Sequence, residues 1–365
     1  MQTNVNDSAK VSHFLAFYLI HSIQVGVGIL GFQRNIARTA GYDAWMAIIL
    51  AGVLFHIVIW IMYKMLNMSS GGDLVSIHRE IFGKWLGGLL SICFMIYFVL
   101  LAISILKSFI LVMQVWMFPD LRSWEIALIY LILIYYAVSK GFRVVTGVCF
   151  LGVVIPAYLY VTFIPPFGFG DARHLLPIYT HSFQDILGAA KQMTYSYLGI
   201  ETFLLYYPFL KNPQKSQKWA HIGNFITILA YLLITFATFV YYSEGKLAHT
   251  IWATLTMWKI VSLPVIERFE IIGITTWIVV ILPNLCLLIW SASRIGKRIS
   301  SIRQKTFLIG ILLLAYVPIC MIVELETTYK LTDKINQVGF YIVYAYIPML
   351  CIVYLLMKKV KKKRE

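Results

Sequence analysis

The residues best suited to hold a small polar ligand lie in two stretches, each inside a long apolar segment. The first stretch runs from His21 to Arg34, and in it Gly26, Gly28 and Gly31 fall within six positions. Each glycine inside a helix costs roughly 1 kcal/mol relative to alanine, so this cluster predicts a helix that breaks. A break inside a membrane frees N–H and C=O groups, which are tolerated only where protein or a ligand satisfies them.

The freed main chain at this first break has the chemistry to bind a zwitterion such as an amino acid. The N–H groups at the start of a half-helix carry about half a positive charge and attract a carboxylate. Carbonyl groups at the opposite half-helix end suit an ammonium group. We therefore predict ligand contacts from Gly26, Gly28, Ile29 and Gly31. The alternative is that small residues let two helices pack closely.

The second stretch, Ser196 to Glu201, places a carboxylate in the middle of another apolar segment. A carboxylate at the bilayer centre costs roughly 3 kcal/mol and normally marks a pathway or a paired site. We predict that Tyr197, Leu198, Gly199 and Glu201 border the ligand. Glu201 could relay protons, bind an amine or brace the two half-helices through their amide groups, and the sequence leaves these roles open.

Three further residues are candidates for the walls of the same site. Tyr97 and Leu101 are four positions apart and share one face of the third apolar segment. Ordinary core packing explains Leu101 equally well. Asn284 follows a proline in the eighth segment, where a buried amide needs partners. Lys107 could pair with Glu201, or it could extend its amine to the membrane surface.

An enzyme has little support in the sequence. The five cysteines all lie in apolar segments without metal-ligand or redox spacing. The histidines form no paired zinc motif, and neither a nucleotide-binding glycine loop nor a nucleophile elbow is present. We therefore expect no catalytic residues, no metal and no cofactor.

The elements that must position these residues are membrane spans. The chain has 365 residues, of which 60% are hydrophobic and 13% charged, a balance too apolar for a soluble domain. We predict ten spans of roughly 20 residues, at 11–32, 42–66, 85–118, 122–139, 144–163, 184–210, 219–243, 269–296, 305–323 and 338–357. The amphipathic stretch 244–268 is expected to lie along the membrane interface.

Basic residues set the expected orientation. With the N-terminus inside, the inside segments hold most of the 31 lysine and arginine residues, so both termini are predicted to be cytoplasmic. The net charge of +15 therefore reflects topology and a lipid-facing basic tail at 358–365, not nucleic-acid binding.

Ten spans divide into two sets of five, and each set opens with a glycine-broken helix. Because five is odd, the second set must enter the membrane from the opposite side. The predicted fold class is thus an all-α polytopic membrane protein with a LeuT-like 5+5 inverted repeat and discontinuous helices 1 and 6. One transmembrane domain, 1–365, would contain repeat one at about 11–163 and repeat two at about 184–357.

Both breaks resemble signatures of the amino acid–polyamine–organocation transporter superfamily. Gly26-x-Gly28-Ile29 looks like its first-helix motif, and Tyr197-x-Gly199-x-Glu201 looks like its sixth-helix motif. Within that superfamily, the whole chain resembles the endospore germinant-receptor B-subunit family. Runs that carry this narrower resemblance are Gly83-Lys84-Trp85, Tyr197 to Glu201, Ile251-Trp252-x-Thr254 and Glu267-Arg268-Phe269-Glu270. One departure is Gln33, where many relatives have proline.

The resemblance implies a nutrient-sensing receptor subunit in the spore inner membrane. It implies a small germinant, commonly an amino acid, bound between helices 1, 3, 6 and 8. It also implies assembly with a larger A subunit and a C lipoprotein subunit in the lipid bilayer. The alternative is a proton-coupled amino acid symporter of the same fold.

Overall fold

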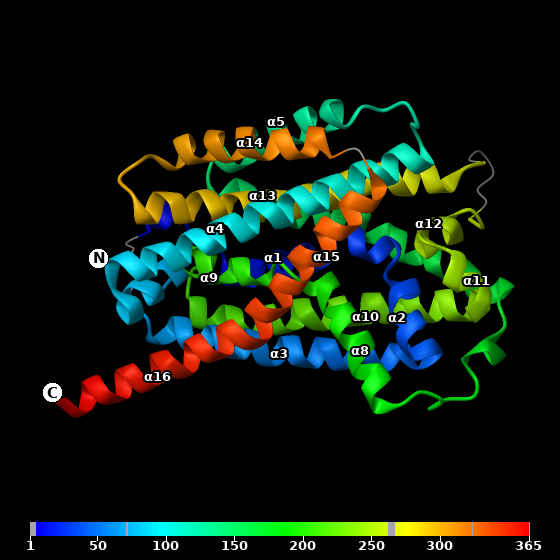
Figure 1. Ribbon diagram of the computed structural model, residues 1–365, viewed down its shortest axis with the longest axis horizontal. Helices are drawn as coiled ribbons and strands as arrows, with labels where there is room; N and C mark the ends of the chain where they lie inside the picture. Colours follow the sequence, from blue (N-terminus) through cyan, green and yellow to red (C-terminus); the bar gives the residue numbers. More distant parts are fainter. Residues whose placement is uncertain (1–4, 71, 262–266, 323, 365) are drawn as a thin grey trace.

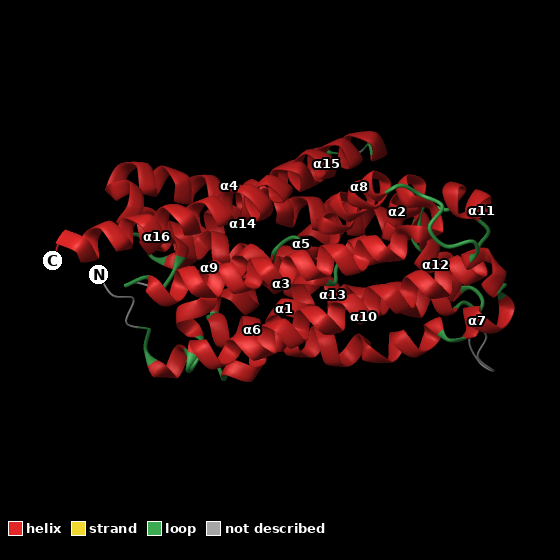
Figure 2. Ribbon diagram, turned by 90° about the horizontal axis from the view of Figure 1, so that it is seen from below, coloured by secondary structure: helices red, strands yellow, loops and turns green. Residues whose placement is uncertain are grey.

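The computed structural model describes residues 5–70, 72–261, 267–322 and 324–364, and the described chain is almost entirely helical (Figures 1 and 2). The end of the predicted ninth span at 323, part of the stretch 244–268 and the last tail residue lie outside these ranges. Within the described residues, seven helices are long and apolar enough to cross a membrane. The protein is an integral multi-pass membrane protein.

The eight spans other than the first and sixth follow the predicted order along the chain. They are α3 (Trp45–Met68), α4 (Leu74–Trp116), α5 (Ser123–Ser139), α6 (Phe142–Val154), α10 (Ser216–Tyr241), α13 (Phe269–Ile299), α14 (Gln304–Met321) and the pair α15 (Leu325–Tyr341) and α16 (Ile347–Arg364). α5 is apolar but has 17 residues, and the first and sixth spans are broken into short helices. The arrangement is therefore consistent with ten spans.

The two predicted breaks are confirmed. α1 (Ala16–Gln24) ends before a single 3-10 turn, Val27–Leu30, and α2 (Phe32–Ala40) follows. In the sixth span, α8 (Phe183–Thr194) and α9 (Phe203–Tyr206) are separated by two 3-10 turns. Gly199 lies between those turns with φ of 102°, a left-handed conformation that residues with a side chain rarely adopt.

Three spans differ from the predicted regular helices. α4 begins well before residue 85 and contains a kink at Gly83, where φ is 76°. The fifth span changes from α6 to a 3-10 helix over Ile155–Phe163, which begins next to Pro156. The tenth span starts at Leu325 instead of 338 and includes a π-helical turn at Ile342–Tyr346. Two of these spans are therefore longer than predicted, and all three contain a local departure from regular α-helix.

The stretch after α10, which we expect along the membrane interface, packs at one end of the bundle (Figure 1). It forms α11 (Glu244–His249) and α12 (Ala253–Trp258). Trp258 is fully buried, and its indole N–H donates to Thr162 Oγ at 2.9 Å. Gly273 makes room for that ring, because a residue with a side chain at this position would place its Cβ 2.3 Å from a Trp258 ring carbon. This stretch therefore covers one end of the bundle beside the first break.

The long helices run roughly parallel, with both chain ends at the same end of the bundle (Figures 1 and 2). α1 is central and contacts α6, α10 and α13. α13 lies along α4, while α5 and α14 pair on the outside. α15 and α16 cross the other helices obliquely in Figure 1. The first break is consequently surrounded by protein on several sides.

A buried ion pair joins two of these helices at the end of the bundle that holds the termini. Asp73 caps the start of α4 by accepting from the Ser76 N–H at 2.8 Å. The guanidinium of Arg298, at the end of α13, donates to Asp73 at 2.8 Å and to the Ser76 hydroxyl at 2.7 Å. The Asp73 side chain is 1% exposed, so this pair is poorly screened by solvent.

Replacing Asp73 with alanine should strongly destabilise the protein. The change leaves Arg298 without its carboxylate and removes the helix cap, a loss of about 3 kcal/mol or more in the free energy of unfolding. Thermal unfolding of the purified protein in detergent measures the effect. Asp7→Ala, which removes the carboxylate of an exposed pair with Lys10, is the matched control and should leave the melting temperature unchanged. Equal melting temperatures for Asp73→Ala and the unmodified protein would contradict this role of the pair.

Candidate functional site

The first break is held by the side chain of Asn284 on α13. The Asn284 amide nitrogen lies 3.0 Å from the Ser22 carbonyl oxygen and 3.1 Å from the Val25 carbonyl oxygen. It also lies 3.0 Å from the Val280 carbonyl oxygen of its own helix. A Cβ at Gly26 would lie 3.1 Å from the Asn284 side-chain oxygen, so the glycine permits this close approach. The structure therefore places two predicted site residues, Gly26 and Asn284, together.

Other side chains donate to three more carbonyl groups of this break. The donors come from α10, α12 and α13: Tyr231 OH to Gln24 O at 2.9 Å, Thr254 Oγ to Ile29 O at 2.8 Å and Trp277 Nε1 to Gly26 O at 3.3 Å. Gln33 extends the second of these contacts, because its amide donates to Thr254 Oγ at 2.7 Å. These three carbonyl groups are thus engaged by the protein itself.

Glu201 braces the second break. Its carboxylate accepts the Gly199 N–H at 2.6 Å and the Tyr97 hydroxyl at 3.1 Å, and the side chain is fully buried. The Thr202 N–H and hydroxyl both donate to the Gly199 carbonyl, at 3.0 and 2.7 Å. Tyr97 and Leu198 also meet at Gly339 of α15, where a Cβ would lie 2.7 Å from the Tyr97 oxygen. The structure therefore brings Tyr97, Leu198, Gly199 and Glu201 together.

The two breaks touch each other. A Cβ at Gly28 would lie 3.0 Å from the Ser196 hydroxyl oxygen, and one at Gly199 would lie 2.6 Å from the Ile23 side chain. The Tyr231 hydroxyl lies between the breaks, 2.9 Å from the Gln24 carbonyl oxygen and 3.4 Å from the Ser196 carbonyl oxygen. Backbone from the first and sixth spans is thus in direct contact.

Other predicted residues lie apart from this contact. Gly31 lies against the chain before α12, because a Cβ there would approach the Ile251 carbonyl oxygen to 2.3 Å. Leu101 is buried in the core of the bundle. The Lys107 amine donates to Ser123 Oγ of α5 at 2.8 Å. Lys107 makes this bond instead of the possible ion pair with Glu201. Tyr197 is fully buried and stacks on Phe55, with ring centroids 5.0 Å apart.

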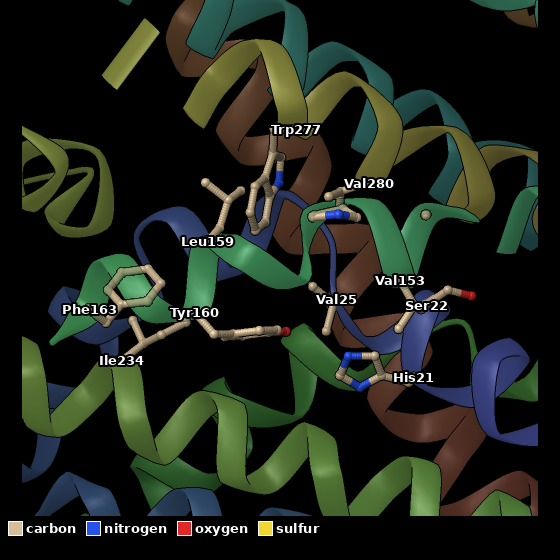
Figure 3. Close-up of a pocket in the computed structure, with 12 residues that line it drawn as sticks. His21, Ser22, Val25, Val153, Leu159, Tyr160, Phe163, Ile234, Trp277 and Val280 are labelled. Carbon is tan, nitrogen blue, oxygen red and sulfur yellow. The ribbon is translucent and has the colours of Figure 1, made fainter. Parts of the chain in front are cut away.

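A small cavity lies beside the first break. It is lined by α1, the 3-10 part of the fifth span, α10 and α13, with His21, Val25, Tyr160 and Trp277 among its walls (Figure 3). Its volume, taken as the space open to the centre of a water molecule, is about 20 Å³. That volume holds a single water molecule or two. An amino acid can enter the region only after the surrounding elements separate.

Metal binding has no support among the described residues. Within residues 5–70, 72–261, 267–322 and 324–364, no group of three or more His, Cys, Asp or Glu side chains is placed to hold a metal ion. The same residues carry five free cysteines, all separate. The arrangement offers a ligand main-chain groups and polar side chains around two helix breaks, with the Glu201 carboxylate at the second break.

Four residues that contact the breaks were not among the predicted site residues: Ser196, Tyr231, Thr254 and Trp277. Each is a polar or amphipathic side chain inside or beside an apolar segment, and such groups need a hydrogen-bond partner when buried. The sequence therefore indicates that these four side chains need hydrogen-bond partners. It does not indicate which carbonyl group each donor will meet.

Comparison with protein families gives one match over most of the chain. A family described as "Spore germination protein" matches residues 10–329. The chain is 42% identical to spore germination protein GerQB of Bacillus cereus over 344 residues, which cover 94% of this chain and 95% of that protein. It is 23% identical to spore germination protein YndE of Bacillus subtilis (strain 168), over 95% of this chain and 96% of that one.

Solved transporter structures share the fold. A Na+-coupled sialic acid symporter in a substrate-bound outward-open state aligns with a TM-score of 0.67 at 14% identity, covering 96% of this chain and 79% of that one. MhsT in complex with L-phenylalanine aligns with a TM-score of 0.62 at 13% identity, covering 94% and 88%. At such low identity the alignments show a shared fold and nothing more. The shared fold confirms the predicted LeuT-like class with broken first and sixth helices. The repeat boundaries stay a prediction.

Replacing Glu201 with glutamine should leave the fold nearly as stable, because an amide oxygen still accepts the Gly199 N–H. Glu201→Ala should cost about 2 kcal/mol or more in the free energy of unfolding, since the buried N–H loses its acceptor. Tyr97→Phe, which removes the weaker contact, is the matched control and should cost about 1 kcal/mol. Thermal unfolding ranks the three variants. A Glu201→Gln variant as unstable as Glu201→Ala would show that the brace requires the carboxylate.

Proposed function

The chain belongs to the spore germination protein family, the family of germinant-receptor B subunits, and we propose that it senses a small nutrient for such a receptor. The nutrient would bind between the two helix breaks. Binding would signal germination through partner subunits. A receptor subunit of this kind needs no catalytic residues, and we propose that the chain is not an enzyme.

One observation carries the proposal: two unwound segments from opposite halves of the chain meet at Gly28 and Ser196. In transporters built from inverted repeats, unwound helix segments near the membrane midplane form the ligand site. The family membership supports a role in germination. The contact between the breaks supports the location of the site.

The chemistry of the first break favours a ligand that carries a carboxylate. Five of its carbonyl groups are already engaged by side-chain donors. The N–H groups at the start of the Val27–Leu30 turn have no carbonyl partner within that turn, as at any helix start. An anionic group therefore finds donors at the break, and we propose an amino acid or a related small carboxylate as the germinant.

Binding must be coupled to movement, because Gly28 and Ser196 leave no gap for a ligand between them. A ligand shifts a conformational equilibrium only by its difference in affinity for the two states. The germinant would therefore stabilise an arrangement in which the breaks separate. We propose that this arrangement is read by a larger A subunit and a C lipoprotein in the spore inner membrane, with both termini of this chain on the core side.

The runner-up function is proton-coupled amino acid symport. The solved structures with this fold include a coupled symporter, and Glu201 supplies a buried carboxylate next to the site. A symporter must complete a transport cycle, whereas a receptor subunit needs only to change state. The two functions therefore predict different results with the same purified protein.

Substitution of Gly28 with leucine should abolish germinant binding while the protein still accumulates in the membrane. The added side chain would enter the contact with Ser196, where a Cβ alone already lies 3.0 Å from the hydroxyl oxygen. Gly147→Leu is the matched control, because Gly147 is an exposed position of α6 with open space around it. A thermal-shift screen with amino acids measures binding, since a ligand that binds the folded state alone raises its melting temperature. An unchanged ligand response in Gly28→Leu would place the site elsewhere.

Uptake by proteoliposomes separates receptor from symporter. Vesicles that contain the purified chain should not accumulate labelled amino acid when a pH gradient is imposed. The amino acid for this assay is whichever one raises the melting temperature in the screen. Accumulation above that of empty vesicles would favour the symporter and contradict a purely sensory role.

A further inference from the structure

Three carbonyl oxygens converge on one nitrogen atom at the first break. The oxygens of Ser22, Val25 and Val280 lie 3.0, 3.1 and 3.0 Å from the Asn284 side-chain nitrogen. All four residues are at least 94% buried. An amide NH₂ group has two hydrogens and cannot donate to three acceptors at full strength. The cluster therefore has more acceptors than its central group has donors.

The identity of the central atom follows from the electrostatics. If the amide were turned over, its oxygen would face three carbonyl oxygens at about 3 Å, which is repulsive. The nitrogen must therefore point into the cluster. The oxygen then faces Gly26, the position at which a side chain would crowd it.

The cluster is also placed where a positive charge is favoured. Ser22 is in the last turn of α1, and Val25 is the residue that ends this helix. The unpaired carbonyl groups at a helix C-terminus carry roughly half a negative charge. In inverted-repeat transporters, unwound carbonyl groups at such helix ends coordinate the coupling cation. Here the partial positive charge of an amide group occupies that position.

We propose that the Asn284 amide nitrogen fills a monovalent-cation position, so that this chain holds its first break closed without binding Na+ or K+. This inference goes beyond the proposed function, because it concerns the ion dependence of the fold and requires no germinant. Asn284 acts as a positioning residue: it ties α13 to both sides of the break in the way that an ion would.

The proposal predicts that a single substitution creates a cation site. Asn284→Asp replaces the donor group with a carboxylate, whose oxygens are repelled by the three carbonyl oxygens. A bound monovalent cation removes this repulsion and gains four or more oxygen ligands. The variant should therefore depend on Na+ or K+ for stability, whereas the unmodified protein should not.

The predicted cation dependence is tested by thermal unfolding of the detergent-purified protein. The melting temperature is measured in NaCl, KCl and choline chloride at equal ionic strength. The unmodified protein should give one melting temperature in all three salts. Asn284→Asp should melt about 2 °C or more higher in NaCl or KCl than in choline chloride. A general loss of packing at this position would lower all three temperatures equally, so the salt dependence separates a cation site from a structural defect.

Asn224→Asp is the matched control. Asn224 is a fully buried asparagine of α10 whose amide nitrogen donates to a single carbonyl oxygen, that of Gly52, at 3.0 Å. This variant should gain no salt dependence. The proposal is overturned if Na+ or K+ stabilises the unmodified protein over choline, if folded Asn284→Asp shows no cation dependence, or if Asn224→Asp gains the same dependence. Should Asn284→Asp not fold, the comparison of the unmodified protein in the three salts still decides.

Discussion

An unwound main chain inside a membrane must find a hydrogen-bond partner for every polar group, and this requirement organises the whole structure. Five carbonyl groups at the first break accept from side chains of α10, the α12 segment and α13. Each donor fixes the position of the helix that carries it. The break is therefore the point at which these elements converge, and packing elsewhere must accommodate that arrangement.

The two breaks meet this requirement in different ways. Glu201 and Thr202 fold back onto Gly199, so both main-chain polar groups of Gly199 are satisfied within its own span. The first break depends on residues far away in the sequence. A displacement of the second break can therefore preserve its internal contacts. A displacement of the first must rearrange contacts to three other elements.

Local features could be predicted from the sequence, and distant partners could not. The glycines and Glu201 identified both breaks, because backbone freedom and a buried charge are properties of single positions. The donors to the first break could not be assigned, since Asn284 meets Ser22 across 262 positions. The early start of the tenth span was also missed. The first turns of this span, from Leu325, contain charged residues that lower the local hydropathy. The apolar segment that predicts the span therefore begins later than the helix does.

α13 connects the first break to the end of the bundle that holds the termini. Asn284 contacts the break near the middle of this helix, and Arg298 pairs with Asp73 near its end. The 14 helical steps from Asn284 to Arg298 span about 21 Å at 1.5 Å per residue. Asp73 belongs to the part of α4 before the kink at Gly83, a position with freedom to change backbone direction. α13 therefore links the first break to this segment of α4 through a single helix.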